Sequence, residues 1–169
     1  MPPDSAARPA ILDIEASGFG AHSYPIEIGL VRADGWRYCS LIVPQPDWTH
    51  WDGDAERVHG ISRAALQSHG RPAAEVARTL NELLAGQTLY SDGWVVDLPW
   101  LRRLFYAVAL EPAFELSPLE RILSEGQMAH WHAVKAAVLA ASGERRHRAS
   151  SDAWVIQETW WRTRVDSAA

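Results

Sequence analysis

The chain has 169 residues, 47% of them hydrophobic and 22% charged, which is the composition of one globular domain with a sizeable core. Its formal net charge of -5 at pH 7 excludes a general basic field, so a polyanionic ligand must be held locally, by metal or by a few arginines. The single cysteine, Cys39, excludes an internal disulfide and fits a cytoplasmic protein. Because no apolar run approaches the length of a membrane span, we expect no membrane partner.

No internal repeat, low-complexity segment or linker divides the sequence. We therefore expect one domain over residues 10–164, preceded by a short disordered arm at 1–9 and followed by a tail at 165–169.

The domain begins with three stretches rich in strand-forming residues. The first strand is expected at 10–15 and the second at 25–31, and a turn at 33–35 leads into a third strand from Trp36 to Val43. These three strands should form an antiparallel meander.

The first strand carries two carboxylates, Asp13 and Glu15. Because side chains alternate along a strand, both acids share a face with Ile11, while apolar residues take the other face. Two carboxylates on one face of a buried strand repel each other and lose hydration, and a divalent cation is the usual compensation. The alternative is an acid pair exposed at the end of a strand.

The second half of the chain alternates helical and strand patterns. Residues 44–60 show no regular pattern and are expected to form a long loop, after which Ser62 can cap a short helix. The later elements are expected to be a helix from near Pro72 to Gly86, a strand at 88–90, a helix after Asp97 with Pro99 in its first turn, a strand at 113–116, a helix through Met128 closed by Gly143, and a helix from about Ser151 to Arg164.

Strand-helix-strand crossovers require parallel pairing. The chain is therefore predicted to be an α/β protein with a mixed five-stranded sheet, in which three antiparallel strands are followed by parallel ones, with helices on both faces.

Two further acids stand where loops enter helices. Asp97 is one, and simple capping of its helix is the alternative reading. Asp152 is the other, five residues after His147 in a basic segment. On one continuous helix these two side chains would lie about 140° apart, so they converge only if His147 is on the loop and Asp152 in the first helical turn. A cap at Ser150 or Ser151 would supply that break, and a solvated basic loop is the alternative.

Taken together, the three stretches resemble the motifs of the DEDD 3′-to-5′ exonucleases of the histidine subgroup, including ribonuclease T, oligoribonuclease and polymerase III proofreading subunits. The family's D-x-E motif followed by small residues and glycine is matched by Asp13-Ile14-Glu15-Ala16-Ser17-Gly18. Its second motif is matched by Val96-Asp97 and Trp100-Leu101, and its H-x-A-x-x-D motif by His147-Arg148-Ala149-Ser150-Ser151-Asp152. Where the family commonly has a polar pair such as His-Asn before the second acid, this chain has Ser91-Asp92-Gly93-Trp94.

The resemblance implies a ribonuclease-H-like fold and a metal-dependent exonuclease. It implies that Asp13, Glu15, Asp97 and Asp152 hold two divalent ions, Mg²⁺ or Mn²⁺, and that His147 is the general base. The implied catalytic set is therefore these four acids and His147.

The implied partner is the free 3′ end of single-stranded RNA or DNA, and a homodimer is possible. Candidate substrate-binding residues are Ala16, Ser17, Gly18, Phe19, His59 and Trp94. For His59, loop packing is the alternative, and for Phe19 and Trp94 it is core packing. The rival functions are an inactive nucleic-acid-binding module on the same fold and an interaction protein that uses a Trp-rich surface.

Overall fold

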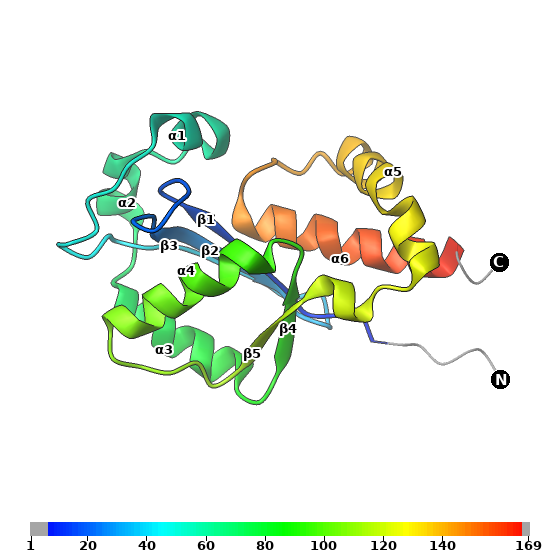
Figure 1. Ribbon diagram of the computed structural model, residues 1–169, viewed down its shortest axis with the longest axis horizontal. Helices are drawn as coiled ribbons and strands as arrows, with labels where there is room; N and C mark the ends of the chain where they lie inside the picture. The colour runs from blue at the N-terminus through cyan, green and yellow to red at the C-terminus, as the bar shows by residue number, and fades with distance from the viewer. Residues whose placement is uncertain (1–6, 167–169) are drawn as a thin grey trace.

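A computed structural model describes residues 7–166 of the chain, and Figure 1 shows a twisted sheet with helices on both of its faces. The strands are β1 (Ile11–Ala16), β2 (Pro25–Val31), β3 (Arg37–Leu41), β4 (Thr88–Ser91) and β5 (Glu115–Pro118). Their order across the sheet is β3-β2-β1-β4-β5, with β1 and β3 antiparallel to β2, and with β4 parallel to both β1 and β5. The predicted mixed sheet of five strands is confirmed.

Two strands differ from their predicted bounds. β3 is shorter than 36–43, because the Ile42 amide makes the last hydrogen bond to β2, at 2.9 Å to the Ile26 carbonyl, and Ile42 then forms an isolated bridge with Arg71. β5 begins later than residue 113, because the Ala113 amide donates to the side chain of Asn81 at 2.7 Å and not to a strand.

The helices are α1 (Gly53–His59), α2 (Arg63–His69), α3 (Ala73–Leu84), α4 (Trp94–Ala107), the 3-10 turn η1 (Leu119–Ile122), α5 (Glu125–Ser142) and α6 (Ala149–Asp166). α1 corrects the prediction of a loop without regular structure over 44–60. It is a short helix without an apolar stripe, and its ends are fixed by the side chain of Asp52, which accepts from the Asp54 amide, and by Gly60 in a left-handed conformation.

α4 and α6 both begin before their predicted first residues. α4 starts at Trp94, because the Trp94 indole donates to the Leu116 carbonyl at 2.9 Å and holds the first turn against β5. Pro99 consequently lies inside the helix and not in its first turn. α6 starts at Ala149, so neither predicted serine is its cap.

The two faces of the sheet carry separate apolar cores. Leu12 and Ile14 of β1 point into the larger core, which α3 and α4 cover. Ile11 points into a smaller core that includes Ile156 of α6. The alternation predicted for β1 is confirmed, and it directs the two acids of that strand toward the face that α6 covers.

α6 approaches the sheet over Gly29 of β2, the strand partner of Asp13. A Cβ atom added to Gly29 would lie 2.2 Å from the Ser150 backbone nitrogen and 2.4 Å from the Ala149 carbonyl carbon. Only glycine allows this approach, since both neighbours are backbone atoms that cannot move aside alone. The close packing brings the first turn of α6 down beside the acids of β1.

The ends of the domain reach beyond the predicted 10–164. Arg8 forms an ion pair with Glu158 of α6 at 2.6 Å, and the Pro9 carbonyl accepts from Gln157 at 2.9 Å, so the last residues of the predicted arm are packed. Residues 1–6 of that arm and 167–169 of the predicted tail lie outside the described residues, while α6 extends to Asp166. Among helices within residues 7–166, none combines the length and apolar composition that crossing a bilayer requires.

We predict that Gly29→Ala lowers the free energy of unfolding by at least about 2 kcal/mol, because the new methyl group overlaps the backbone of α6. Urea denaturation followed by circular dichroism measures this. Gly53→Ala is the matched control, since the nearest atom to a Cβ there is 4.0 Å away and the site is helical. Equal stability of the two variants would show that α6 does not depend on close approach at Gly29.

Candidate functional site

Three segments that are distant in the sequence meet at one place. β1 supplies Asp13 and Glu15, the first turn of α4 supplies Asp97, and the start of α6 supplies Asp152, with His147 just before it. All five residues line one cavity of about 460 Å³. The structure therefore brings together the five residues predicted as catalytic.

The two acids of β1 are held by the sheet. Asp13 pairs across the strands with Gly29 and Glu15 pairs with Glu27, so β2 fixes the backbone positions of both acids. The Oδ2 atom of Asp13 is buried and has no hydrogen-bond partner among the described residues. A buried carboxylate oxygen without a partner is costly, and a proton or a cation must satisfy it.

The electrostatics of this pair follow from burial and from like charges. Burial, followed by repulsion from Asp152 and Glu27, raises the pKa of Glu15 to about 8. Burial, followed by the charges of Asp97 and Glu15, raises the pKa of Asp13 well above its ordinary value. Without a cation, the cavity thus favours protonated carboxyl groups near neutral pH.

Asp97 is oriented by the end of β4. The Ser91 hydroxyl donates to Asp97 Oδ2 at 2.5 Å and accepts from the Gly93 amide at 3.0 Å. Burial raises the pKa of Asp97 to about 7, although the Ser91 hydrogen bond favours its charged form. Ser91 therefore fixes the Asp97 carboxylate. Ser91 belongs to the segment Ser91-Asp92-Gly93-Trp94, which stands where the resemblance leads us to expect a polar pair such as His-Asn.

His147 and Asp152 satisfy the geometric condition set by their spacing. His147 lies on the loop before α6 in a left-handed conformation with φ of 57°, and Asp152 lies in the first turn of the helix. The His147 amide donates to Asp152 Oδ2 at 3.0 Å. This bond fixes the loop to the helix. Strained non-glycine backbone of this kind clusters at functional sites.

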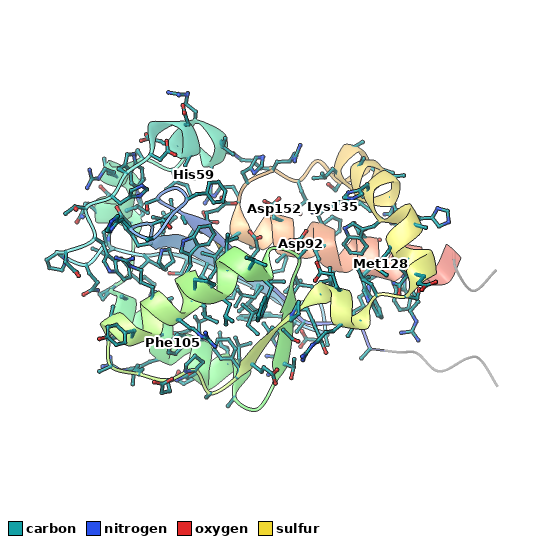
Figure 2. All side chains as sticks on the ribbon, in the orientation of Figure 1. His59, Asp92, Phe105, Met128, Lys135 and Asp152 are labelled. Carbon is teal, nitrogen blue, oxygen red and sulfur yellow. The ribbon has the colours of Figure 1, made fainter. Side chains whose placement is uncertain are left out.

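Glu15, His147 and Asp152 each offer a ligand atom within 4.8 Å of the other two. The nearby cations are already engaged. Arg148 Nε donates to Glu27 at 2.7 Å, and Lys135 Nζ of α5 donates to Asp92 at 2.7 Å. Figure 2 shows Asp92 and Asp152 close to Lys135, with His59 on the other side of the acids. Side chains of the described chain therefore leave much of the negative charge in the cavity unpaired.

Four of the six predicted substrate-binding residues line this cavity, namely Ala16, Gly18, Phe19 and His59. The Phe19 side chain is 74% exposed, and its ring centre lies 6.0 Å from that of Trp100. His59 is buried in α1, where its Nδ1 accepts from the Ile61 amide at 3.0 Å and burial lowers its pKa.

The other two, Ser17 and Trp94, do not line the cavity. The Ser17 hydroxyl is buried, hydrogen-bonded to His50 Nδ1 at 2.9 Å, and accepts from the Tyr24 amide at 3.1 Å. Trp94 is held by its bond to β5. Both residues position the segments around the cavity and do not face into it.

Sequence reasoning missed the wall that α1 forms opposite α4. Asp52, Ala55 and Val58 line the cavity from this side. Gly18 packs so closely on this segment that a Cβ there would lie 2.7 Å from the Asp52 Cβ. The one signal in the sequence was the Asp52-Gly53 step, which is typical of a turn or a helix start.

The residues of the cavity fit a hard divalent cation. Carboxylate oxygens are the ligands that Mg²⁺ and Mn²⁺ prefer, and Asp13 supplies a buried oxygen that lacks a partner among the described residues. No cysteine lines the cavity, which removes the softest ligand. Glu15, His147 and Asp152 form one group that could hold a cation, and Asp13 and Asp97 line the same cavity.

We predict that the chelator-treated protein becomes less stable as pH rises from about 5 to 8. Ordinary carboxyl groups of the unfolded chain release protons near pH 4–4.5, whereas Glu15 and Asp97 in the folded chain hold theirs to a pKa of about 8 and about 7. Unfolding therefore releases protons between pH 5 and 8, so a rise in pH over this range favours the unfolded state. One pKa unit corresponds to about 1.4 kcal/mol, so the two shifts correspond to a loss of several kcal/mol, or on the order of 10 °C in Tm.

Thermal denaturation of Glu15→Gln in chelator should show a flatter pH dependence. Glu82→Gln, at an exposed residue of α3, is the control and should follow the wild type. A wild-type Tm that rises with pH over this window would contradict the assignment of buried, mutually repelling acids.

The fold is similar to part of the exonuclease I structure. A zinc-bound complex of the Escherichia coli enzyme with single-stranded DNA aligns with a TM-score of 0.70 at 14% sequence identity, covering 93% of this chain and 41% of the enzyme. A product-bound exonuclease I gives 0.65 at 15% identity, covering 95% and 45%, and the enzyme from Methylocaldum szegediense gives 0.65 at 15%, covering 86% and 38%. The chain thus spans about two fifths of the length of these enzymes. No protein-family model matches the chain, and no curated protein sequence matches it. The likeness confirms the predicted ribonuclease-H-like exonuclease fold.

Proposed function

We propose that this chain is a divalent-metal-dependent 3′-to-5′ exonuclease of the DEDD type, histidine subgroup, which acts on single-stranded nucleic acid. The observation that carries the proposal is the convergence of four acids and His147 in one cavity, from three motifs matched in order along the sequence. The exonuclease fold supports it, since solved relatives of this fold hold dA16 and dT13 oligonucleotides.

Asp13, Glu15, Asp97 and Asp152 would hold two divalent ions, and the buried Oδ2 atom of Asp13, which has no partner among the described residues, would be satisfied by one of them. When bound, such ions lower the pKa of water and stabilise charge on a phosphate. The repulsion among the four carboxylates makes the empty site unstable and so favours binding of cations.

His147 is the group in the cavity best suited to accept a proton from an attacking water. It lies at the edge of the acid cluster on a loop fixed by its own amide, so its imidazole is placed without being buried. The ring nitrogen of an imidazole can accept a proton and release it again, as a general base must. Phe19 and Trp100 form an aromatic wall on which a terminal base can stack.

The rival functions account for fewer features. A binding module has no need for a complete set of ligands around an unpaired buried carboxylate oxygen. An interaction protein with a Trp-rich surface requires exposed tryptophans, yet Trp36 is the one tryptophan among the large, well-exposed apolar side chains of the described residues. Most of the tryptophans serve the two cores and the walls of the cavity.

We predict that the protein releases mononucleotides from a 5′-labelled linear single strand in Mg²⁺ or Mn²⁺, and that Ca²⁺ binds but supports turnover poorly. Chelator should stop the reaction, and adding metal back should raise Tm through preferential binding to the folded state. Asp13→Asn should fold and lose more than about tenfold in rate, because it removes the charge of a carboxylate whose buried oxygen would bind a cation.

The matched control substrate is a circular single strand of the same sequence, which offers no 3′ end. Cutting of the circle, or full activity in excess EDTA, would refute a metal-dependent exonuclease.

We predict that His147→Ala lowers the maximal rate by roughly 10²–10⁴-fold, the loss typical of removing a general base, while metal affinity is retained. Rates measured at saturating metal, with the metal dissociation constant from calorimetry, separate the two effects. His130→Ala is the control histidine, since its side chain is exposed on α5 and does not line the cavity. If His147→Ala loses metal affinity and keeps its rate at saturating metal, His147 is a ligand and not the base.

A further inference from the structure

A second cavity of about 380 Å³ lies on the outer face of α4, next to the catalytic cavity. It is formed by Trp100, Arg102, Arg103 and Tyr106 of the helix and by Gly20 and Ala21 of the β1–β2 connection. Trp100 lines both cavities, so the two hollows adjoin at this side chain. We name this second hollow the α4 groove.

The α4 groove carries positive charge that no carboxylate of the described chain neutralises by an ion pair. Arg102 is exposed and has no partner among residues 7–166. Arg103 Nη1 donates to the Ala21 carbonyl at 3.0 Å, and its guanidinium lies 5.9 Å from the ring centre of Trp48. Arg103 is therefore fixed in place, while Arg102 is free to contact an anion.

The same groove exposes aromatic surface. Tyr106, which lines the α4 groove, is 89% exposed. Phe19, which lines the neighbouring catalytic cavity, is 74% exposed. Arg102 and Tyr106 are four residues apart and share one side of α4. From Trp100 to Tyr106 the helix rises about 9 Å, enough for a short stretch of polymer. Cations alternating with stackable rings are the composition of a surface for single-stranded nucleic acid.

We propose that the α4 groove holds the part of a single strand that lies 5′ of the nucleotide being removed. This inference rests on the proposed function and extends it from the terminal nucleotide to the path of the strand. When the 3′ end of a strand occupies the acid-lined cavity, the rest of the strand must extend out of that cavity. On the side formed by Trp100, it would pass over Arg102 and Tyr106. Arg102 binds a backbone phosphate and Tyr106 stacks on a base.

The test compares a short and a long substrate in the double variant Arg102→Ala/Tyr106→Ala. Both side chains are exposed and make no hydrogen bond or ion pair within the described chain, so the fold should survive, whereas Arg103 is spared because it holds the β1–β2 connection. We expect KM for an oligothymidylate of about eight nucleotides to rise about tenfold or more, with kcat unchanged. A dinucleotide, which occupies the catalytic cavity alone, should keep its wild-type KM and kcat.

A binding measurement makes the result independent of catalysis. The dissociation constant of a 5′-fluorescein oligothymidylate, measured in Ca²⁺ over a salt series, should rise about tenfold in the double variant, and its salt slope should fall by about 0.7 for one lost phosphate contact. Arg102→Lys and Tyr106→Phe should restore the charge and the stacking. Arg121→Ala, at an exposed arginine of η1 that Figure 1 places on the other side of the molecule from the C-terminal end of α4, is the surface control.

The outcomes separate the two claims. If the wild type degrades both substrates and the double variant matches Arg121→Ala within twofold on the long one, the α4 groove is not on the strand path although the exonuclease proposal stands. If the wild type degrades neither substrate, the proposed function fails, and the binding series still decides the groove. Equal losses on the dinucleotide and the long oligomer would overturn the groove as well, since they would indicate damage to the catalytic cavity.

Discussion

Repulsion among carboxylates is the constraint on which the rest of this structure depends. Four acids from β1, α4 and α6 line one cavity, and the pKa of Glu15 and of Asp97 is raised to about 8 and about 7 as a result of burial and like charge. A fold that needed only stability would not collect these groups. The two apolar cores on either side of the sheet offset the cost. Compensation at the cavity itself must come from protons or from bound cations.

The basic residues nearest the acids do not provide that compensation, because the structure uses them elsewhere. Arg148 and the Ala149 amide both donate to Glu27, which is fully buried beneath the start of α6. Glu27 therefore acts as a buried anchor for the helix that carries Asp152, and the close approach over Gly29 sets the depth of that helix. Lys135 is bound in the same way to Asp92 and ties α5 to the segment before Asp97. These pairs hold the acids in position while leaving their charge unneutralised.

The parts of this arrangement that sequence reasoning reached are those governed by periodicity. The period of two along β1 placed Asp13 and Glu15 on one face, and the incompatibility of His147 and Asp152 on one helix required the break that the structure shows. The break comes from the backbone of His147 and not from a serine cap, since a left-handed residue can end a loop without a capping side chain. A residue-by-residue pattern does not encode such a backbone choice.

The parts that sequence reasoning missed are those fixed by contacts distant along the chain. α1 has no apolar stripe, and its place beside β1 depends on Gly18 packing against Asp52 and on the Asp52 amide donating to the Ser17 carbonyl at 2.9 Å. The start of α4 likewise depends on a hydrogen bond from Trp94 to β5. Ser17 and Trp94 were expected to face a substrate because they flank the matched motifs, and tertiary hydrogen bonds turn both away from the cavity.

The net charge describes the surface as a whole, but it does not show where the positive and negative side chains lie. At -5 the chain has no general attraction for a polyanion, and the acids of the acid-lined cavity would repel one until cations occupy it. Arg102 and Arg103 lie one side chain away from that cavity, beyond Trp100, so attraction for a strand is separated from the acids that need cations. Such a separation lets a site bind metal without its own arginines competing for the carboxylates. The same separation holds for Arg148 and Lys135, which lie near the acids. Each is paired with a carboxylate, Glu27 or Asp92, that does not line the acid-lined cavity.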